Sequence, residues 1–451
     1  MDWKGVKVAV VGLGSSGLAA VELLAGGGAK VTAVDAKPLE ELGGAAEALS
    51  RHAVPFRLQS AEALAGADWI IVSPGVPADL ELLNEARERG VRVIGEVELA
   101  SYFLKGETIG ITGSNGKTTT TALVGHLLKE CGIPAQVGGN IGTVPATAMA
   151  ATSEERQWNV LELSSFQLET IERFRARIAV ALNVTDDHLD RHHTFERYAD
   201  AKARLFETQA PEDWAVLNAD DPVTSGFSSR TKGRCLWFSL TRPVAPGAWL
   251  EGENLVLGGA PLIPVKDVPL RGRHNLENVM AAASAAFLAG APGPGIAAAI
   301  RTFRAVEHRL EFVATVRGIH FYNDSKATNV DSALKAVEAL DAPLWIILGG
   351  KDKGGDYSPL AAGLRAKARA ALLIGAAAPL IARALEGAVP LLHCGTLENA
   401  VATAIREASP GDTVVLAPAC ASFDQFESYE HRGRVFKQAV ARLAESSARG
   451  A

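Results

Sequence analysis

The sequence is poor in cysteine, and the few cysteines show no metal-binding or redox spacing. Cys131, Cys235, Cys394 and Cys420 stand far apart, and none belongs to a Cys-x-x-Cys pair. This spacing excludes a disulfide framework and a cysteine-ligated zinc site as organising features. We therefore expect buried thiols at all four positions and a reducing compartment, the cytoplasm.

Long apolar runs and an excess of positive charge are missing as well. Glycines and Glu22 interrupt the apolar stretch 8–29, no basic region precedes it, and no later stretch offers about 20 unbroken apolar residues. We thus expect no signal peptide and no membrane insertion. The formal net charge of −6 argues against a nucleic-acid-binding protein.

Short apolar runs alternate with helical segments along almost the whole chain, which is the pattern of parallel sheets covered by helices. The chain has 451 residues. At about 100–200 residues per domain it should contain two to four domains, and we favour three. Strands are predicted within 6–12, 30–35, 69–75, 91–95, 108–111, 158–166, 178–184, 214–221, 343–350, 370–375 and 412–419, with a hairpin at 308–325. The predicted α/β domains are a Rossmann-like domain at 1–100, a central P-loop ATPase-like parallel sheet with a β-rich insert (235–272) at 101–305, and a C-terminal Rossmann-like domain at 306–451.

The first glycine-rich turn has the spacing of a dinucleotide-binding site. In VVGLGSSG the glycines stand at 12, 14 and 17, and Asp35 follows about 20 residues on. Glycines at this spacing let the backbone approach a pyrophosphate at a helix N-terminus. The motif alone does not say which pyrophosphate binds, so an NAD(P)-dependent oxidoreductase stays open as an alternative function.

The second glycine-rich turn, GITGSNGKTTTT, predicts a phosphate-binding loop. A strand ends at Ile111, a turn follows, and Lys117 and Thr118 open a helix. Ile111 stands where the common P-loop pattern has its first glycine. Backbone N–H groups there would hold phosphates, Lys117 would reach the β- and γ-phosphates, and the Thr118 hydroxyl would bind Mg²⁺.

Two metal-competent side chains lie where later strands of the same sheet should end. Glu162 interrupts the apolar run NVLEL, and His188 follows ALNVTDD. Taken singly, Glu162 is equally well explained as a partnered buried acid and His188 as a loop residue. Beside a phosphate-binding loop, a Mg²⁺ site is the better interpretation, because ligands of open α/β sheets bind at the carboxyl ends of the strands.

Lys202 occupies an unusual position on its predicted helix. In TFERYADAKARLF it stands seven residues after Phe195 and four after Tyr198, on the apolar stripe. Burying an unpaired ammonium is costly, so the amine either reaches outward to water or is paired or modified. The pattern alone favours an amine that reaches outward.

Eight segments together resemble the Mur ligases of peptidoglycan synthesis. They are GITGSNGKTT, LELSSFQLE, NVTDDHLDRH, YADAKARLF, HNLENVMAA, NDSKATN, LGGKDKGGD and APACASFDQF, within a resemblance that runs from Gly12 to about Gly433. LELSSFQLE and NDSKATN favour the D-glutamate-adding members. Relatives that add L-alanine, diamino acids or dipeptides, and folylpolyglutamate synthase, share the ATP loop and are the alternatives.

The resemblance implies a cytoplasmic, monomeric, ATP-dependent ligase that joins D-glutamate to UDP-N-acetylmuramoyl-L-alanine through an acyl phosphate. It also implies two Mg²⁺ ions and a carbamate formed from CO₂ on Lys202, which would act as an oxygen ligand and replaces the outward-reaching amine as our expectation. His308 and Arg309 resemble groups that close on ATP.

The residue roles implied by the resemblance fall into five sets. The catalytic residues would be Lys117, His188 and Lys202. The metal ligands would be Thr118, Glu162, His188 and Lys202. ATP would be bound by Gly113, Ser114, Asn115, Gly116, Lys117, Thr118, Thr119, Asn275, Asn278, Arg309, Asp324 and Lys326. The UDP substrate would be bound by Gly14, Ser15, Ser16, Gly17, Asp35, Lys37, Ser73, Pro74, Gly75 and Asn140. D-Glutamate would be bound by Thr328, Lys353, Ser422, Phe423 and Tyr429.

Overall fold

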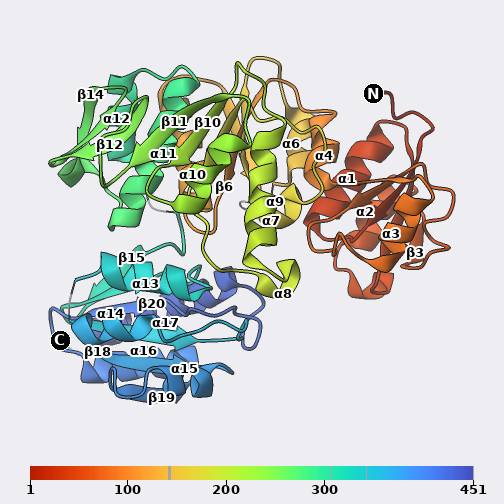
Figure 1. Cartoon of the computed structure of the whole chain (residues 1–451). Coiled ribbons are helices and arrows are strands. Elements are labelled where there is room, and N and C mark those ends of the chain that lie inside the picture. The colour runs from red at the N-terminus through yellow and green to blue at the C-terminus, as the bar shows by residue number, and fades with distance from the viewer. Residues whose placement is uncertain (141–143, 305, 342, 450–451) are drawn as a thin grey trace. The chain divides into compact units, whose positions relative to one another are not determined.

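The computed structural model describes residues 1–140, 144–304, 306–341 and 343–449, which form two compact units (Figure 1). Unit 1 contains Met1–Asp267 and Glu277–Arg301, and unit 2 contains Val268–Leu276 and the chain from Thr302 onward. The domain boundaries expected near 100 and 305 stay predictions, and residue 305 itself lies outside the described residues. No helix in the described ranges is long and apolar enough to span a bilayer.

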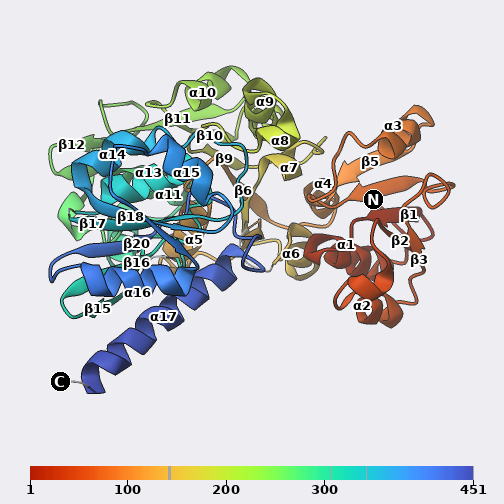
Figure 2. The same ribbon diagram turned by 90° about the horizontal axis from the view of Figure 1, so that it is seen from below.

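The first sheet of unit 1 is a doubly wound parallel sheet with the strand order β3-β2-β1-β4-β5. Helices α1 and α2 pack their apolar side chains on one face, and α3 covers the other (Figure 2). Strands β1, β2, β4 and β5 are mostly buried, which explains their continuous apolar runs, whereas the edge strand β3 has no buried residue. Its elements are β1 (Lys7–Val11), α1 (Ser15–Gly26), β2 (Lys30–Asp35), a 3₁₀ turn η1 (Leu39–Glu41), α2 (Ala45–Arg51), β3 (Phe56–Leu58), β4 (Trp69–Val72), α3 (Glu81–Glu88), β5 (Arg92–Gly95) and α4 (Glu96–Ser101).

The second sheet of unit 1 has nine strands in the order β14-β13-β12-β11-β10-β9-β6-β8-β7. Strands β6 to β12 pair in parallel, with β6 at the centre between β8 and β9. The first parallel strands and their helices are β6 (Glu107–Thr112), α5 (Lys117–Glu130), β7 (Ala135–Gly139), α6 (Ala146–Thr152), β8 (Trp158–Glu162), α7 (Ser165–Leu168), β9 (Ile178–Ala181), α8 (Leu189–His192), α9 (Phe195–Glu207) and β10 (Trp214–Asn218).

The predicted β-rich insert does not form a separate domain. Its strands extend the nine-stranded sheet, because β12 pairs in parallel with β11, and β13 and β14 then add antiparallel strands at the edge. The remaining elements of this region are α10 (Pro222–Gly226), η2 (Phe227–Ser229), β11 (Arg234–Ser239), β12 (Gly247–Glu251), β13 (Asn254–Leu257), β14 (Ala260–Pro264), η3 (Val265–Asp267), α11 (Arg273–Leu288) and α12 (Gly293–Thr302).

Unit 2 contains a six-stranded sheet in the order β15-β16-β20-β17-β18-β19. The predicted hairpin is confirmed, because β15 and β16 pair antiparallel, and all later pairs are parallel. In Figure 2 the long helix α17 runs beside α16 on this sheet. Its elements are β15 (Glu311–Val316), β16 (Ile319–Asn323), α13 (Val330–Ala339), β17 (Leu344–Gly349), α14 (Leu360–Lys367), β18 (Ala368–Ile374), α15 (Ala378–Ala384), β19 (Leu391–Gly395), α16 (Leu397–Glu407), β20 (Thr413–Leu416) and α17 (Tyr429–Arg449).

Candidate active site

The first glycine turn joins β1 to α1 and is held together from within. Gly12 has a φ of +87°, and a Cβ on Gly17 would lie 1.8 Å from the Gly12 carbonyl oxygen. Gly17 therefore lets the helix pack against the turn. The Asp35 carboxylate accepts hydrogen bonds from the backbone N–H of Leu13 at 2.7 Å and of Lys37 at 3.0 Å. One oxygen of Asp35 thus stabilises the glycine turn through Leu13, and the other stabilises the loop after β2 through Lys37.

A cavity of about 650 Å³ opens beside this turn. Helix α1 begins after Gly14 without a side-chain cap, so its first N–H groups are available to an anion. Every residue predicted to bind the UDP substrate lines the cavity except Gly17, which lies beneath the turn. The lining residues are Gly12, Leu13, Gly14, Ser15, Ser16, Asp35, Ala36, Lys37, Gln59, Ser73, Pro74, Gly75, Val76, Pro77, Leu80, Gly139, Asn140, Pro145 and Gln167.

The second glycine turn lies between β6 and α5, and α5 begins at Lys117 as the sequence predicts. Gly113 and Gly116 have φ values of +150° and +86°, which is backbone that glycine adopts without strain. A Cβ on Gly116 would also lie 2.2 Å from Oδ1 of Asn278. The Lys117 ammonium folds back to donate to the carbonyls of Gly113 at 2.7 Å and Ser114 at 2.9 Å.

Asn183, which the sequence analysis did not single out, holds this loop. Its Oδ1 accepts from the N–H of Asn115 at 2.9 Å, and its Nδ2 donates to the carbonyl of Asn115 at 3.2 Å. Its own carbonyl accepts from the N–H of Ser114 at 2.8 Å. The side-chain amide therefore fixes the main chain of the loop in the way that a paired strand would. Two signals were available, the position of Asn183 two residues after a buried strand and its place as the first residue of the NVTDDHLDRH segment.

Lys202 is buried, and its amine does not reach water. The side chain is 1% exposed, and its Nζ donates to the Gly113 carbonyl at 2.9 Å, the same oxygen that Lys117 uses. The pattern-based expectation of an outward-reaching amine is therefore wrong. Burial lowers the pKa of Lys202 well below its ordinary value and Lys117 lowers it further, while Asp187 and Glu162 act in the opposite direction.

Glu162 ends β8 next to the second glycine turn, and one of its carboxylate oxygens has no hydrogen-bond partner. Its Oε1 accepts from Nδ2 of Asn140 at 2.8 Å, whereas its buried Oε2 has no hydrogen-bond partner. A buried carboxylate oxygen without a partner is costly unless a cation supplies one. This oxygen, together with the Thr118 hydroxyl at the start of α5, fits the hard oxygen donors that Mg²⁺ prefers.

His188 lies in the loop after β9, in left-handed backbone with a φ of +54°. Its ring packs edge-on against Phe166 at 4.9 Å between centroids, and its Nε2 lies 3.7 Å from the Asp187 carboxylate. Asp187 can thereby orient the imidazole. Glu162 ends β8, Lys117 follows β6 and His188 follows β9, so all three lie at the carboxyl ends of adjacent strands.

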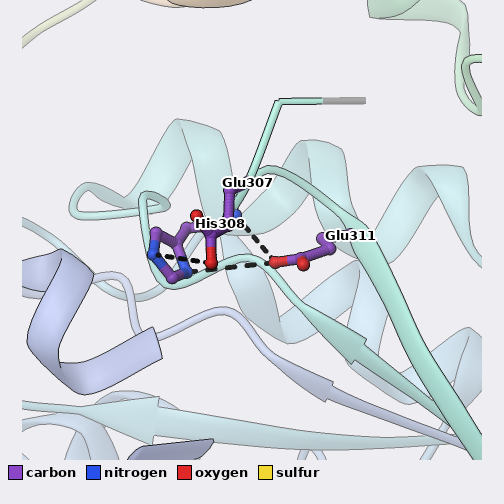
Figure 3. Close-up of side chains that lie close together, drawn as sticks. All are labelled: Glu307, His308 and Glu311. Carbon is purple, nitrogen blue, oxygen red and sulfur yellow. Dashed lines mark hydrogen bonds and ion pairs between the residues drawn. The ribbon is translucent and has the colours of Figure 1, made fainter. Parts of the chain in front are cut away.

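A second group of possible metal ligands lies in unit 2, where the sequence analysis had singled out only His308. Among the residues the structure describes, it is the one set of three His, Cys, Asp or Glu side chains whose ligand atoms lie within 4.8 Å of one another: Glu307, His308 and Glu311 (Figure 3). The Lys437 ammonium already contacts both glutamates, at 3.1 Å in the case of Glu311. A lysine in this position disfavours a metal ion there.

Four of the residues predicted to bind D-glutamate lie on loops at the carboxyl ends of β16, β17 and β20 in unit 2, and the fifth, Tyr429, is the first residue of α17. Thr328 follows β16, Lys353 follows β17, and Ser422 follows β20. Ser422 is buried, whereas Phe423 is 67% exposed. These three strands are neighbours in the sheet, so the structure brings their loops together.

The residues predicted to close on ATP are divided between the two units. In unit 2, the Lys326 ammonium lies 3.8 Å from the centre of the Tyr429 ring. Burial raises the pKa of Asp324 to about 6, although Arg309 and the N–H of Leu310 oppose the shift. Asn275 belongs to unit 2 and donates to the Arg271 carbonyl, while Asn278 belongs to unit 1.

Comparisons with known proteins match nearly the whole length of this chain to Mur ligases. The family model for a MurD-like Mur ligase N-terminal domain matches residues 6–95, that for the Mur ligase middle domain matches 111–286, and that for the Mur ligase glutamate ligase domain matches 308–420. The UDP-N-acetylmuramoylalanine–D-glutamate ligase of Solibacter usitatus is 60% identical over 440 residues, which cover 98% of both chains. The protein of the same name from Acidobacterium capsulatum is 51% identical over 98% of this chain and 97% of its own.

Solved structures share the fold at much lower identity. A pseudomurein peptide ligase type C from Methanothermus fervidus superposes with a TM-score of 0.62 at 19% identity, over 97% of this chain and 100% of that chain. The UDP-N-acetylmuramate-alanine ligase of Thermotoga maritima gives 0.61 at 19% identity, over 98% and 99%.

Proposed function

Because the chain belongs to the Mur ligase family, we propose that it joins D-glutamate to UDP-N-acetylmuramoyl-L-alanine in an ATP-dependent, ADP-forming reaction of peptidoglycan precursor synthesis. The observation that carries this proposal is the 60% identity, over 98% of both chains, to a relative named for that reaction. The use of ATP and of a nucleotide-linked precursor is consistent with a cytoplasmic enzyme, and we expect a monomer.

The reaction proceeds in two displacements. A carboxylate oxygen of the precursor attacks the γ-phosphorus of ATP, ADP leaves, and an acyl phosphate forms. The amine of D-glutamate then attacks the acyl carbon, and phosphate leaves as the amide bond forms. The first step brings a carboxylate against a triphosphate, so the enzyme must neutralise charge while it aligns the oxygen with the phosphorus.

The second glycine turn would bind ATP for the first displacement. The N–H groups from Gly116 to Thr119, at the start of α5, would hold the phosphates of ATP, whereas those of Ser114 and Asn115 donate to Asn183. Lys117 would exchange its two carbonyl contacts for the β- and γ-phosphates, since a charged partner binds an ammonium more strongly than a carbonyl does. Asn183 would keep the loop in shape during that exchange.

Thr118, Glu162, His188 and a carbamylated Lys202 would together hold two Mg²⁺ ions. The unpartnered Oε2 of Glu162 supports this assignment. Bound Mg²⁺ neutralises phosphate oxygens and helps to position them. The lowered pKa of Lys202 favours a neutral amine, which can add to CO₂ and lose a proton to give the carbamate.

The cavity beside the first glycine turn would hold the UDP moiety, remote from the bond that forms. The N–H groups at the start of α1 suit a pyrophosphate, and UDP carries one as a dinucleotide does. Asp35 is engaged with backbone N–H groups, which favours a structural role for this residue over binding a nicotinamide cofactor's ribose. The loops after β16, β17 and β20 would hold D-glutamate.

The test measures ADP and phosphate release by the purified protein with each substrate omitted in turn. We expect release only when UDP-N-acetylmuramoyl-L-alanine, D-glutamate, ATP and Mg²⁺ are all present. Replacing D-glutamate by L-alanine, a diamino acid or, with a folate acceptor, L-glutamate separates the related ligases. Release that does not depend on D-glutamate would refute the proposal, and tight NADH binding without competition from UDP would favour the oxidoreductase.

A further inference from the structure

Arg432 is a fully buried cationic residue to which the proposed mechanism assigns no role. It lies in the first turn of α17, and its side chain is 0% exposed. Lysine and arginine are almost never fully buried without a partner of opposite charge. In the part of the chain that the structure describes, the hydrogen bonds of the Arg432 guanidinium all go to uncharged oxygens.

Those bonds tie two loops together. Nε donates to Oγ of Ser325 at 3.0 Å, and Nη2 donates to the Ser325 carbonyl at 2.8 Å. Nη1 donates to the carbonyls of Cys420 at 3.2 Å and Ala421 at 3.3 Å, and Nη2 also reaches Cys420 at 3.2 Å. One planar guanidinium therefore fixes the loop after β16 to the loop after β20.

A third loop closes over the same group. A Cβ on Gly350, which follows β17, would lie 3.1 Å from Nη1 of Arg432 and 2.2 Å from the Ala421 carbonyl oxygen. Lys351 pairs with Ala421 through two backbone hydrogen bonds of 2.9 and 3.1 Å. Arg432 thus lies beneath all three loops at the carboxyl edge of the unit 2 sheet, where open α/β sheets bind their ligands.

Arg432 keeps its positive charge at neutral pH. Burial lowers the pKa of Arg432 to about 10, while Cys420 and Asp424 oppose the shift, so the group stays cationic at neutral pH. The Asp424 carboxylate is engaged with the N–H of Ala376 at 2.9 Å. A fixed positive charge in a water-poor site is screened less than the charge of an exposed lysine.

We propose that Arg432 is a positioning and specificity-determining residue, which fixes the three loops of the D-glutamate pocket and gives that pocket a permanent positive charge that favours a dicarboxylate. This inference rests on the proposed function. It adds to the residues named for that pocket one that touches no substrate and acts through the three loops that carry Thr328, Lys353 and Ser422. Lys353 would contact the substrate directly, whereas Arg432 holds the loops in place and supplies a buried positive charge.

Three full-length variants test the proposal. Arg432→Gln removes the charge, Arg432→Lys keeps the charge but loses the planar fork, and Arg434→Gln is the matched control on an exposed position of the same helix. Steady-state ADP release is measured with each substrate varied in turn. We expect the KM for D-glutamate to rise about 30-fold in Arg432→Gln and about fivefold in Arg432→Lys, because hydrogen bonds that involve a charged group are the stronger ones. The KM for the UDP precursor should stay within about twofold, as in Arg434→Gln, and the KM for ATP should rise less than that for D-glutamate, because only the Ser325 loop carries residues assigned to ATP, Asp324 and Lys326.

Several results would overturn this inference. They are an unchanged KM for D-glutamate, a parallel rise for all substrates, a fall in kcat alone, and an Arg432→Lys variant as impaired as Arg432→Gln. If Arg432→Gln does not fold, the selective change in Arg432→Lys decides. A wild-type enzyme that does not need D-glutamate refutes the proposed function itself. A D-glutamate-dependent wild type whose Arg432 variants match Arg434→Gln refutes only the role of Arg432.

Discussion

Replacing Asn183 should weaken ATP binding without touching the ATP. Asn183→Ala removes the two side-chain hydrogen bonds to the main chain of Asn115, at 2.9 and 3.2 Å. Each such bond contributes about 1 kcal/mol net, and the Asn115 N–H and carbonyl then lack these partners, so the loss is about 2 kcal/mol. Since about 1.4 kcal/mol corresponds to a tenfold change, the KM for ATP should rise about 30-fold if the loop must be ordered to bind.

Asn183→Asp provides the discriminating comparison. It keeps the acceptor for the Asn115 N–H but places an oxygen 3.2 Å from the Asn115 carbonyl, where the amide nitrogen now donates. We expect this variant to be at least as impaired as Asn183→Ala, whose smaller side chain leaves room for water. ADP release with ATP and D-glutamate varied separately is the assay. The reasoning fails if Asn183→Ala keeps the wild-type KM for ATP, or if the KM for D-glutamate rises equally.

Three further predictions concern other parts of the molecule. Lys202→Ala should abolish ADP release, and short carboxylic acids should partly restore it by supplying the missing oxygen ligand; wild-type turnover in the variant would contradict the carbamate. Gly17→Ala should raise the KM for the UDP precursor and leave the KM for ATP unchanged, because the new Cβ would lie 1.8 Å from the Gly12 carbonyl oxygen. Asp324 has its pKa raised from 3.8 to about 6, so the folded state binds more protons than the unfolded state in that interval, and stability falls as pH rises through it. Asp324→Asn should therefore gain stability over wild type between about pH 4 and pH 6, measured by urea unfolding, and an equal difference at both ends would refute the shift.

The strands that sequence analysis missed have a common physical cause. β3, β7 and β19 were not predicted, and each is one of the two edge strands of its sheet. The burial patterns of β3 and β19 include no buried residue, and that of β7 includes one. A continuous apolar run marks a strand only where both of its faces are covered. The central strands, such as β6 before Lys117, were therefore predictable.

The candidate site was predictable where function needs a particular side chain and unpredictable where it needs a long-range contact. Lys202 was conspicuous because a lysine on an apolar stripe breaks the pattern. Its partner, the Gly113 carbonyl, lies 89 residues away in sequence, and no local pattern points to it. Asn183 and Arg432 act on partners 68 and 107 residues away, and both belong to residue types that are ordinary on a protein surface.

The burial of Lys202 also limits the size of the molecules that can reach and react with its amine. An amine that is 1% exposed and bonded to the Gly113 carbonyl cannot be reached by a bulky acylating reagent while the loop stays in place. A slim, uncharged molecule such as CO₂ needs far less space. The rate at which a large amine-reactive acylating reagent labels Lys202 would then measure how often the loop opens, and bound nucleotide should slow that labelling. A lysine in this position could thus serve as a built-in reporter of loop motion.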